Sequence, residues 1–410
     1  KDRYPEAEIR EAMEDIQELI DREELFTKDT YSQYVTDFKQ RKTVVKALCL
    51  HIAHDCNLAC RYCFAEEGEY HGRRALMSYE VGKKALDFLI ANSGNRRNLE
   101  VDFFGGEPLM NWDVVKRLVE YGRSQEEAHN KKFRFTITTN GLLLDEDKRK
   151  YINENMDNCV LSLDGRREVN DEFRKTVAGT GSYDTIVPKF KALVDERDPN
   201  LDYYARGTFT SHNLDFAEDV LSIADAGFDR LSVEPVTADP GCGYDLTEDD
   251  LPKIEAEYDR LTDIMLERKK EGKPFTFFHF MVDLDQGPCV VKRLRGCGAG
   301  YEYVAVTPDG DIYPCHQFVG KDEFKQGSVL DQSFNMDIAQ KFAGMNIYSR
   351  PKCQKCWAKF YCSGGCSAAN YNMNHDMNDS YDLGCEMERK RLECAIYLKA
   401  MDKICANQSK

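Results

Sequence analysis

The 410-residue chain has the composition of a globular protein, and its charge excludes several kinds of partner. A hydrophobic content of 42% can supply the core of one large domain and one or two smaller ones. The 56 basic and 72 acidic residues give a net charge of -16, so nucleic acid is not expected as a partner. The sequence has no signal peptide and no run of about 18 apolar residues, so we expect a cytoplasmic protein without membrane contact.

The hydrophobic pattern changes along the chain. Residues 6–25 have apolar positions at helical spacing and predict an amphipathic helix. From residue 44 onward, short β-branched or aromatic runs alternate with longer helical patterns. The predicted strands are 44–52, 99–104, 133–139, 159–163, 203–210 and 231–236. The predicted helices between and after them are 79–91, 112–129, 146–155, 183–195, 214–226 and 248–270.

Six strands that are each followed by a helix predict an α/β fold with a parallel sheet and right-handed crossovers. We expect this sheet to form a partial (β/α)6 TIM-like barrel with its active site at the carboxyl ends of the strands. A flat, doubly wound sheet is an alternative that the pattern leaves open. The predicted domains are an N-terminal helical segment (1–42), the barrel (43–280), a cysteine-rich domain (281–386) and a C-terminal helix (387–410).

Sixteen cysteines are many for a long chain without an export signal, and most of them occur at tight spacings. Ten lie between Cys289 and Cys405, where glycine and polar residues surround many of them. Disulfides are typical of small secreted domains, so here the spacings indicate metal ligands in a reducing compartment. The region after about residue 280 is therefore predicted to fold around metal.

The first cysteine group, Cys56, Cys60 and Cys63, follows the first predicted strand directly. Three thiolates spaced C-x3-C-x2-C can hold three corners of a 4Fe-4S cube and leave the fourth iron open to another ligand. A zinc site that lacks one ligand, or a cluster completed by a distant cysteine, are the alternatives. The position at the carboxyl end of a barrel strand favours catalysis.

This motif, with Tyr62 at its aromatic position, resembles the radical S-adenosylmethionine (SAM) superfamily. The resemblance implies that the open iron binds the amino and carboxylate groups of SAM. Reductive cleavage of the sulfonium then produces a radical that abstracts hydrogen from the substrate, while the protein supplies position and excludes water.

The next loops agree with that resemblance. Gly105 and Gly106 follow the second predicted strand, where glycines allow close backbone approach to a ligand, and Glu107 can meet an ammonium group. Such a segment is otherwise a simple turn, but here it resembles the contact of the family with the amino group of methionine. Glu234 ends the sixth strand near the expected adenine position.

Polar residues at the ends of the third and fourth predicted strands are further candidates for cofactor binding. Thr139 and Asn140 follow one strand, and Ser162 and Asp164 end the next and can offer hydroxyl and carboxylate groups to a ribose. Arg174 has a guanidinium group that suits the methionine carboxylate. A solvated loop charge is the alternative for Arg174.

A second group of seven cysteines resembles the SPASM domain of peptide-modifying radical enzymes, which contains two auxiliary 4Fe-4S clusters. The resemblance implies a distal cluster on four of them and a nearer cluster on three, which makes three clusters in total with the catalytic one. The distal ligands would be Cys353, Cys356, Cys362 and Cys385, and the nearer ones Cys297, Cys315 and Cys366. Zinc held by the C-x2-C pair is the alternative for the first two.

The fourth position of the nearer cluster is open at this stage. Cys289 could fill it, or a substrate thiol could bind there as a thiolate and give up an electron to the cluster as its sulfur joins carbon. The remaining cysteines have no cluster spacing and are predicted to be small buried hydrophobic residues. They are Cys49, Cys159, Cys242, Cys394 and Cys405.

Across nearly the whole chain the motifs resemble the maturases of six-cysteine (SCIFF) peptides, most closely in residues 48–67 and 301–320. The resemblance implies an enzyme that forms thioether crosslinks, as in sactipeptides and ranthipeptides, within a precursor peptide. A leader sequence would dock on a winged-helix domain, of which residues 4–34 contain only the helical half, or these residues simply pack on the barrel. A flavodoxin or ferredoxin would supply electrons.

Two other functions compete with this interpretation. An anaerobic sulfatase maturase has the same domain plan, but it should ligate both auxiliary clusters fully and require a general base, for which Asp283 and Asp285 are guesses. An electron carrier or a zinc-stabilised binding module belongs to a different class. Iron content and colour separate these from an enzyme with three clusters.

Overall fold

The computed structural model describes residues 4–34, 44–70, 72–285 and 289–408. The chain forms two compact units, Lys1–Lys42 and Thr43–Lys410. In the first unit, α1 (Glu6–Asp21) has no buried side chain. It ends before residue 25 because Glu23 adopts a left-handed backbone conformation, with φ of 57°. The predicted boundary after residue 42 lies outside the described residues.

The larger unit is built on one mixed sheet of order β10-β9-β8-β6-β5-β4-β1-β11-β12-β13-β14, with β3 beside β1. Its central six strands are parallel neighbours and follow chain order without reversal, unlike a doubly wound sheet. All six were predicted to within three residues at either end. They are β1 (Ala47–His54), β4 (Asn98–Gly105), β5 (Lys132–Thr139), β6 (Asn158–Ser162), β8 (Asp202–Phe209) and β9 (Arg230–Pro235).

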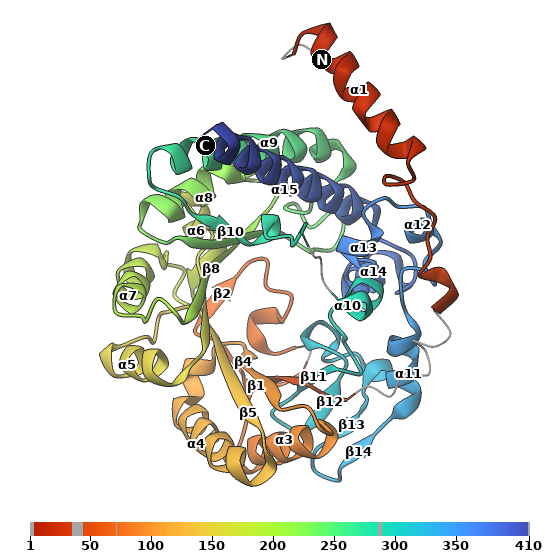
Figure 1. Ribbon diagram of the computed structural model, residues 1–410. Coiled ribbons are helices and arrows are strands. Elements are labelled where there is room, and N and C mark those ends of the chain that lie inside the picture. Colours follow the sequence, from red (N-terminus) through yellow and green to blue (C-terminus); the bar gives the residue numbers. More distant parts are fainter. Residues whose placement is uncertain (1–3, 35–43, 71, 286–288, 409–410) are drawn as a thin grey trace. The chain divides into compact units, whose positions relative to one another are not determined.

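Helices cover the outer face of this sheet (Figure 1). The six predicted helices are confirmed, and Ser78 and Asp145 cap two of them by accepting hydrogen bonds from backbone N–H groups. The helices are α3 (Tyr79–Asn92), α4 (Trp112–His129), α5 (Glu146–Asn155), α6 (Arg167–Phe173), α7 (Tyr183–Asp195), α8 (Phe216–Asp225) and α9 (Leu251–Lys270), of which α6 was not predicted.

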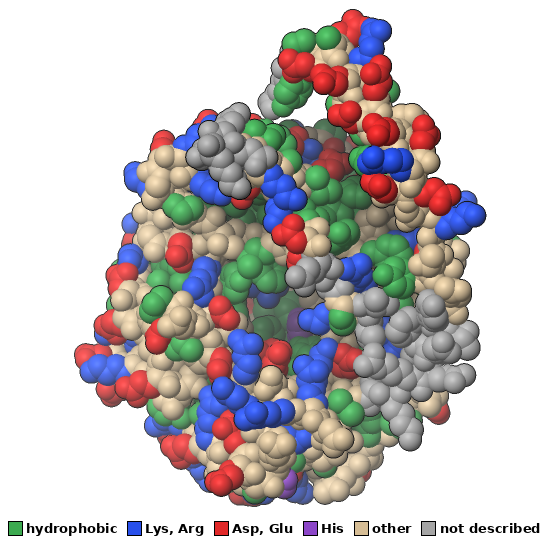
Figure 2. Space-filling model, viewed as in Figure 1, with side chains coloured by type: hydrophobic (Ala, Val, Ile, Leu, Met, Phe, Trp, Pro, Cys, Tyr) green, Lys and Arg blue, Asp and Glu red, His purple; other side chains and the backbone are tan. Residues whose placement is uncertain are grey.

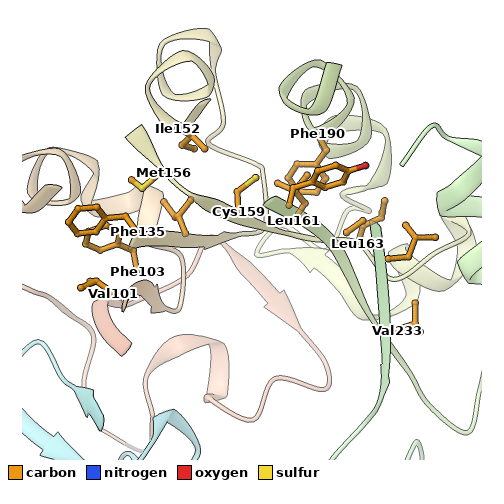
Figure 3. Packing of buried hydrophobic residues seen from close by; sticks show 14 of the residues in the cluster. Val101, Phe103, Phe135, Ile152, Met156, Cys159, Leu161, Leu163, Phe190 and Val233 are labelled. Atoms are coloured by element: carbon orange, nitrogen blue, oxygen red, sulfur yellow. The ribbon is translucent and has the colours of Figure 1, made fainter. Parts of the chain in front are cut away.

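The core lies between the sheet and these helices. Along β4 and β5, alternate residues are fully buried, and the rings of Phe103 and Phe135 stack with centroids 5.7 Å apart. Figure 3 shows these rings beneath Ile152 and Met156, and Leu161 beneath Phe190 of α7. Burial of one such side chain stabilises the fold by about 1.5–3 kcal/mol. The intervening residues of the same strands face the other side of the sheet, where the site lies.

The cysteine-rich region continues the same sheet. β11 pairs in parallel with β1, although sequence periodicity did not reveal this four-residue strand, and β12, β13 and β14 follow as antiparallel neighbours. A separate two-stranded sheet joins β2 to β7. The bounds are β2 (Leu58–Cys60), β3 (Ala75–Leu76), β7 (Arg174–Thr176), β10 (Thr276–Phe277), β11 (Tyr303–Val306), β12 (Asp311–Tyr313), β13 (Gly327–Ser328) and β14 (Ser333–Phe334).

The same region contains several short helices, and one long helix follows them. They are α10 (Val290–Arg295), α11 (Met336–Gly344), α12 (Pro351–Gln354), α13 (Lys359–Cys362), α14 (Ser367–Asn374) and α15 (Asp382–Gln408). Helix α15 packs along α9 (Figure 1), where Arg391 Nε donates a hydrogen bond to the Tyr258 hydroxyl at 2.8 Å. It begins at Asp382, so the boundary predicted at residue 387 falls inside it. Among the helices of the described ranges, none combines the length and apolar content needed to span a bilayer.

Candidate active site and auxiliary metal sites

The first cysteine group lies in the loop that follows β1. Within that loop, β2 pairs with β7 so that Cys60 is opposite Arg174. Burial, together with the neighbouring Cys63 thiol, raises the pKa of Cys56 and of Cys60 to about 12, so the three sulfurs lie near one another. Such thiols stay protonated at neutral pH unless a bound cation displaces the proton. The loop therefore suits a metal centre better than a free nucleophile.

A cavity of about 260 Å³ opens beside the three thiols. Its wall consists mainly of residues at the carboxyl ends of the parallel strands, together with two residues of the cysteine-rich region. Besides the three cysteines, the predicted residues in the wall are Tyr62, Gly105, Gly106, Thr139, Asn140, Ser162, Arg174 and Glu234. The strands thus bring together most of the residues that the sequence singled out.

Two glycines form a tight cradle at the end of β4. A Cβ atom on Gly105, which has φ of 123°, would lie 2.3 Å from the Ala53 carbonyl oxygen, and one on Gly106 would lie 2.1 Å from that of Asp55. No other residue fits at these positions without movement of the backbone. The backbone can therefore approach a ligand closely beside the cysteine loop.

Glu107 has a different position from the predicted one, because its carboxylate is fully buried and absent from the cavity wall. One carboxylate oxygen accepts hydrogen bonds at 2.9 Å from Leu109 N and from the Thr139 hydroxyl, and the other accepts one from Asn140 N at 2.7 Å. Burial raises the pKa of Glu107 to about 7 in spite of these bonds. Glu107 thus joins two loops of the site, and the glycine backbone faces the cavity in its place.

Asp164 likewise lies behind the wall. Its carboxylate accepts hydrogen bonds from the Tyr62 hydroxyl at 2.6 Å and from Thr208 N at 3.0 Å, and Arg174 Nε lies 3.1 Å from it. The side chain is fully buried, so it is not available to a ribose, whereas Ser162 lines the cavity. Asp164 instead orients Tyr62 and Arg174.

The wall also contains residues that the sequence reading did not select: Arg206, Thr208, His316 and Gln317. Arg206 Nη2 lies 2.6 Å from Glu234 Oε2 across neighbouring strands. Arg206 and Thr208 are two residues apart in a predicted strand, so strand periodicity would have placed them on one face. His316 follows a predicted cluster ligand directly, but its orientation toward the cavity depends on the β11–β12 hairpin.

The four predicted ligands of the distal cluster line a second cavity of about 240 Å³. Cys353 and Cys362 belong to α12 and α13, Cys356 lies between these helices, and Cys385 belongs to α15. Burial raises the pKa of Cys362 to about 12 and that of Cys385 to about 11. Arg389 Nη1 lies 4.0 Å from the Cys356 sulfur. Residues 32 positions apart in sequence therefore converge on one thiol-lined site.

The three predicted ligands of the nearer cluster also come together. Burial raises the pKa of Cys315, and the Cys366 and Cys297 thiols raise it further. These cysteines follow β12, precede α14 and follow α10, respectively. Cys289 is exposed at the start of α10.

Of the cysteines without cluster spacing, Cys49, Cys159 and Cys394 are buried as predicted. The prediction is wrong for Cys242, which is half-buried, and for Cys405, which is exposed. Within the described ranges, no three His, Cys, Asp or Glu side chains are close enough to hold a single metal ion. A four-iron cube is larger than one ion and holds its thiolates further apart.

Comparison with known families agrees with this arrangement. Residues 50–204 match the radical SAM superfamily, and residues 297–357 match an iron-sulfur cluster-binding domain, SPASM. The chain therefore contains a radical SAM domain followed by a SPASM domain. These two domains support binding of SAM and of iron–sulfur clusters.

Related sequences extend over most of the chain. A cysteine-type anaerobic sulfatase-maturating enzyme of Clostridium novyi is 25% identical over 350 residues, which cover 81% of this chain and 90% of the relative. The mycofactocin maturase MftC of Mycolicibacterium smegmatis is 26% identical and covers 79% of each chain.

Two solved structures share the fold. The structure of anSMEcpe with bound AdoMet has a TM-score of 0.70 at 20% identity and covers 87% of this chain and 99% of its own. Streptococcus suis SuiB bound to its precursor peptide SuiA has a TM-score of 0.61 at 18% identity and covers 92% and 89%.

The cavity residues fit SAM on an iron–sulfur cluster. The thiols of Cys56 and Cys60 have raised pKa values and require a cation to become thiolates. The glycine cradle exposes backbone to the cavity, and Arg174 supplies a positive charge in the wall. A thiol set, a backbone surface and a guanidinium thus meet in one place, which matches the iron, amino and carboxylate contacts of the cofactor.

Proposed function

We propose that the chain is a peptide maturase that forms thioether crosslinks between cysteine sulfur and a carbon of an acceptor residue in a cysteine-rich precursor. The nearer cysteine set carries this proposal. In that set the thiols of Cys366 and Cys297 raise the pKa of Cys315, so three thiols lie close together. In the distal set four thiols line one cavity. A nearer cluster with three protein ligands has one iron free for a substrate thiol. The relatives, which include maturases, support a peptide or protein substrate.

Cys56, Cys60 and Cys63 would hold the catalytic cluster, and the Gly105 and Gly106 backbone would face the methionine half of SAM. Bound there, SAM supplies hydrogen-atom abstraction from an unactivated C–H bond, and an auxiliary cluster supplies an acceptor for the electron released as sulfur joins that carbon. The other cavity residues, among them Ser162, Arg174 and Glu234, orient the cofactor and exclude water.

A substrate thiol bound to iron would release its proton to solvent, because a bound cation strongly lowers the pKa of a thiol. The crosslink therefore needs no carboxylate base, and the cavity offers little for one. Among the described residues of the wall, Glu234 is the one carboxylate, and Arg206 already donates a hydrogen bond to it. The guesses Asp283 and Asp285 do not line the cavity, and Asp285 accepts a hydrogen bond from Lys399 at 2.5 Å. This favours thioether formation over conversion of cysteine to formylglycine, the alternative that the sulfatase-maturating relatives suggest.

The unreversed strand order supports a sheet that curls into a partial (β/α)6 barrel within 43–280, with auxiliary clusters in 281–386.

Three clusters are expected in total, reduced by a donor such as flavodoxin or ferredoxin in the cytoplasm. Residues 1–42 would be the helical part of a winged-helix domain for a leader sequence, and the precursor-bound SuiB structure supports a peptide partner.

Iron content tests the cluster assignment first. Purified without oxygen, the chain should contain about twelve irons and absorb broadly near roughly 400 nm, as expected for three cubane clusters. Zinc without iron would reject the proposal. Cys289→Ser should keep this iron content if a substrate thiol completes the nearer cluster, and the matched variant Cys297→Ser should lose that cluster.

Peptide chemistry tests the reaction. Incubation with reductant, SAM and a cysteine-rich precursor should remove two hydrogen atoms per crosslink without gain of oxygen, and the crosslinked cysteines should resist alkylation. A precursor with serine at these positions should give no crosslink, and Cys60→Ala should give none with the original precursor. A product that has lost sulfur and gained oxygen would instead identify a formylglycine-forming enzyme.

A further inference from the structure

Arg350 is a buried arginine between the two auxiliary cysteine sets. Arg350 directly precedes α12, which contains Cys353, and is 3% exposed. Its Nη2 donates a hydrogen bond to the Ser367 hydroxyl at 2.8 Å, and its Nη1 donates one to the Gly364 carbonyl oxygen. Its Nε is buried and has no hydrogen-bond partner among the described residues.

The segment that Arg350 contacts joins the two sets. It runs from Cys362, predicted for the distal cluster, to Cys366, predicted for the nearer one, between α13 and α14 (Figure 1). Gly364 at its centre has φ of 92°, and a Cβ atom there would lie 2.3 Å from Arg350 Nη1. The glycine thus leaves room for the guanidinium.

Within the part of the chain that the structure describes, the charge of Arg350 has no carboxylate partner. Among the described residues, no Asp or Glu oxygen forms an ion pair with it. The groups that act most strongly on it are the thiols of Cys353 and Cys362 from the distal set and of Cys366 and Cys297 from the nearer set. Burial lowers the pKa of Arg350 and these thiols raise it. Removing a guanidinium from water is costly unless an anion compensates it.

Two cluster anions on either side would provide that compensation. A 4Fe-4S cluster with thiolate ligands has a net negative charge, which increases by one unit when it is reduced. Its potential depends on nearby charges, hydrogen bonds and solvent exposure. A fixed cation that no carboxylate neutralises therefore favours the reduced state of every cluster within reach of its field.

We propose that Arg350 is a positioning residue shared by both auxiliary clusters, which holds the Cys362–Cys366 segment and raises the reduction potential of each cluster through its positive charge. This inference rests on the proposed function, because it requires clusters at both cysteine sets. The inference gives Arg350 a role in electron acceptance, although Arg350 is part of neither cavity wall.

The test uses the full chain with Cys56, Cys60 and Cys63 replaced by alanine, so that only auxiliary signals remain. Each cluster takes one electron from an external titrant of known potential, and electron paramagnetic resonance follows the reduction. Arg350→Gln removes the charge, and Arg350→Lys keeps it. Arg389→Gln removes a cation in the wall of the distal cavity, beside Cys356 and Cys385 of the distal set. Arg149→Gln is the matched control, because that arginine pairs with Glu196 on the outer helices.

We expect Arg350→Gln to shift both potentials to more negative values, Arg350→Lys to restore them in large part, and Arg389→Gln to shift one of them. Loss of iron in the Gln variant but not in the Lys variant would also support a requirement for the charge. Unchanged potentials at full iron content, or equal loss of iron in both variants, would overturn the proposal. Fewer than about eight irons in the parent chain would instead contradict the cluster assignment.

Discussion

The sheet-and-helix region and the cysteine-rich region of the larger unit are stabilised in different ways. The first has long strands and helices around a continuous apolar core that includes Phe103, Phe135 and Phe190. The second has helices of four to nine residues, strands of two to four and a smaller apolar cluster. Four-residue helices are unstable alone. We therefore infer that iron binding stabilises this region, whereas burial of apolar side chains stabilises the other.

The face of the molecule drawn in Figure 2 has a hollow in its surface. Near its centre the surface is hollowed, with hydrophobic side chains in the hollow and basic side chains along its lower edge. A core that fills only one side of a sheet leaves the other side open for a site. The catalytic cavity lies on that second side, as the alternation of buried and half-buried residues along the strands requires.

The largest effect is expected from loss of auxiliary iron. Cys353→Ala together with Cys385→Ala should remove the distal cluster and open residues 351–385, because structural metals contribute on the order of 10 kcal/mol to such regions. Hydrogen exchange should show this opening while β4 and β5 stay protected.

The matched control for that experiment is Cys56→Ala, which should remove the catalytic cluster and leave the protection of residues 351–385 unchanged. If the double variant kept that protection, the cysteine-rich region would be stable without its metal, and the contrast between the two regions would disappear.

The opposite perturbation should destabilise the other region. Phe135→Ala should cost about 3–5 kcal/mol, because the fully buried ring leaves a cavity between the sheet and its helices. Anaerobic thermal unfolding checks this value. Phe278→Ala is the control, since that ring is 49% exposed, and it should change stability by less than about 0.5 kcal/mol. Equal costs for both would mean that the apolar cluster does not hold the sheet region together.

The two regions were also predictable in different ways. Alternating Phe133, Phe135 and Ile137 define β5 by periodicity alone, and the core formed where that pattern placed it. In the cysteine-rich region, β11 is too short for its period to be visible in sequence. There the resemblance to the SPASM domain predicted which cysteines would converge, but not that this region would add strands to the sheet beside β1.

The candidate site shows the limit of such reasoning at the level of single side chains. Sequence placed Glu107 and Asp164 at strand ends, where carboxylates reach a ligand, and the strand ends are indeed where they lie. Both carboxylates instead turn into the protein, toward backbone N–H groups and side chains of neighbouring loops. The position of a residue at the end of a strand determines where its backbone lies. Hydrogen-bond partners from distant segments determine where its side chain points.

A smaller and more local effect should follow from Gly106→Ala. The new Cβ atom would meet the Asp55 carbonyl oxygen at 2.1 Å and push the cradle away from the cysteine loop. We expect affinity for SAM to fall about a hundredfold, roughly 3 kcal/mol, at unchanged iron content. Equilibrium binding under anaerobic conditions measures this. Gly344→Ala, where a Cβ atom has nothing within 4 Å, should bind SAM normally, and equal affinity in both variants would exclude the cradle from the binding surface.

The smallest effect concerns the pH dependence that Glu107 imposes on the sheet region. Burial raises its pKa from 4.5 to about 7 in the folded protein. Because the folded-state pKa is the higher one, the stabilising contribution is complete below about pH 4.5 and is lost as the pH rises through about 7. Glu107→Gln cannot titrate and should be free of this loss.

The difference in unfolding free energy between the native chain and Glu107→Gln should therefore change by roughly 2 kcal/mol between pH 5.5 and 8. The native chain should become less stable relative to the variant at the higher pH. Unfolding midpoints of the two proteins at each pH give this difference, and any constant offset from the lost Asn140 hydrogen bond cancels. Parallel pH profiles would mean that the three hydrogen bonds to the carboxylate outweigh its burial. Glu107 would then remain charged at the catalytic pH, and its negative charge would bear on the sulfur of Cys56, whose pKa it raises.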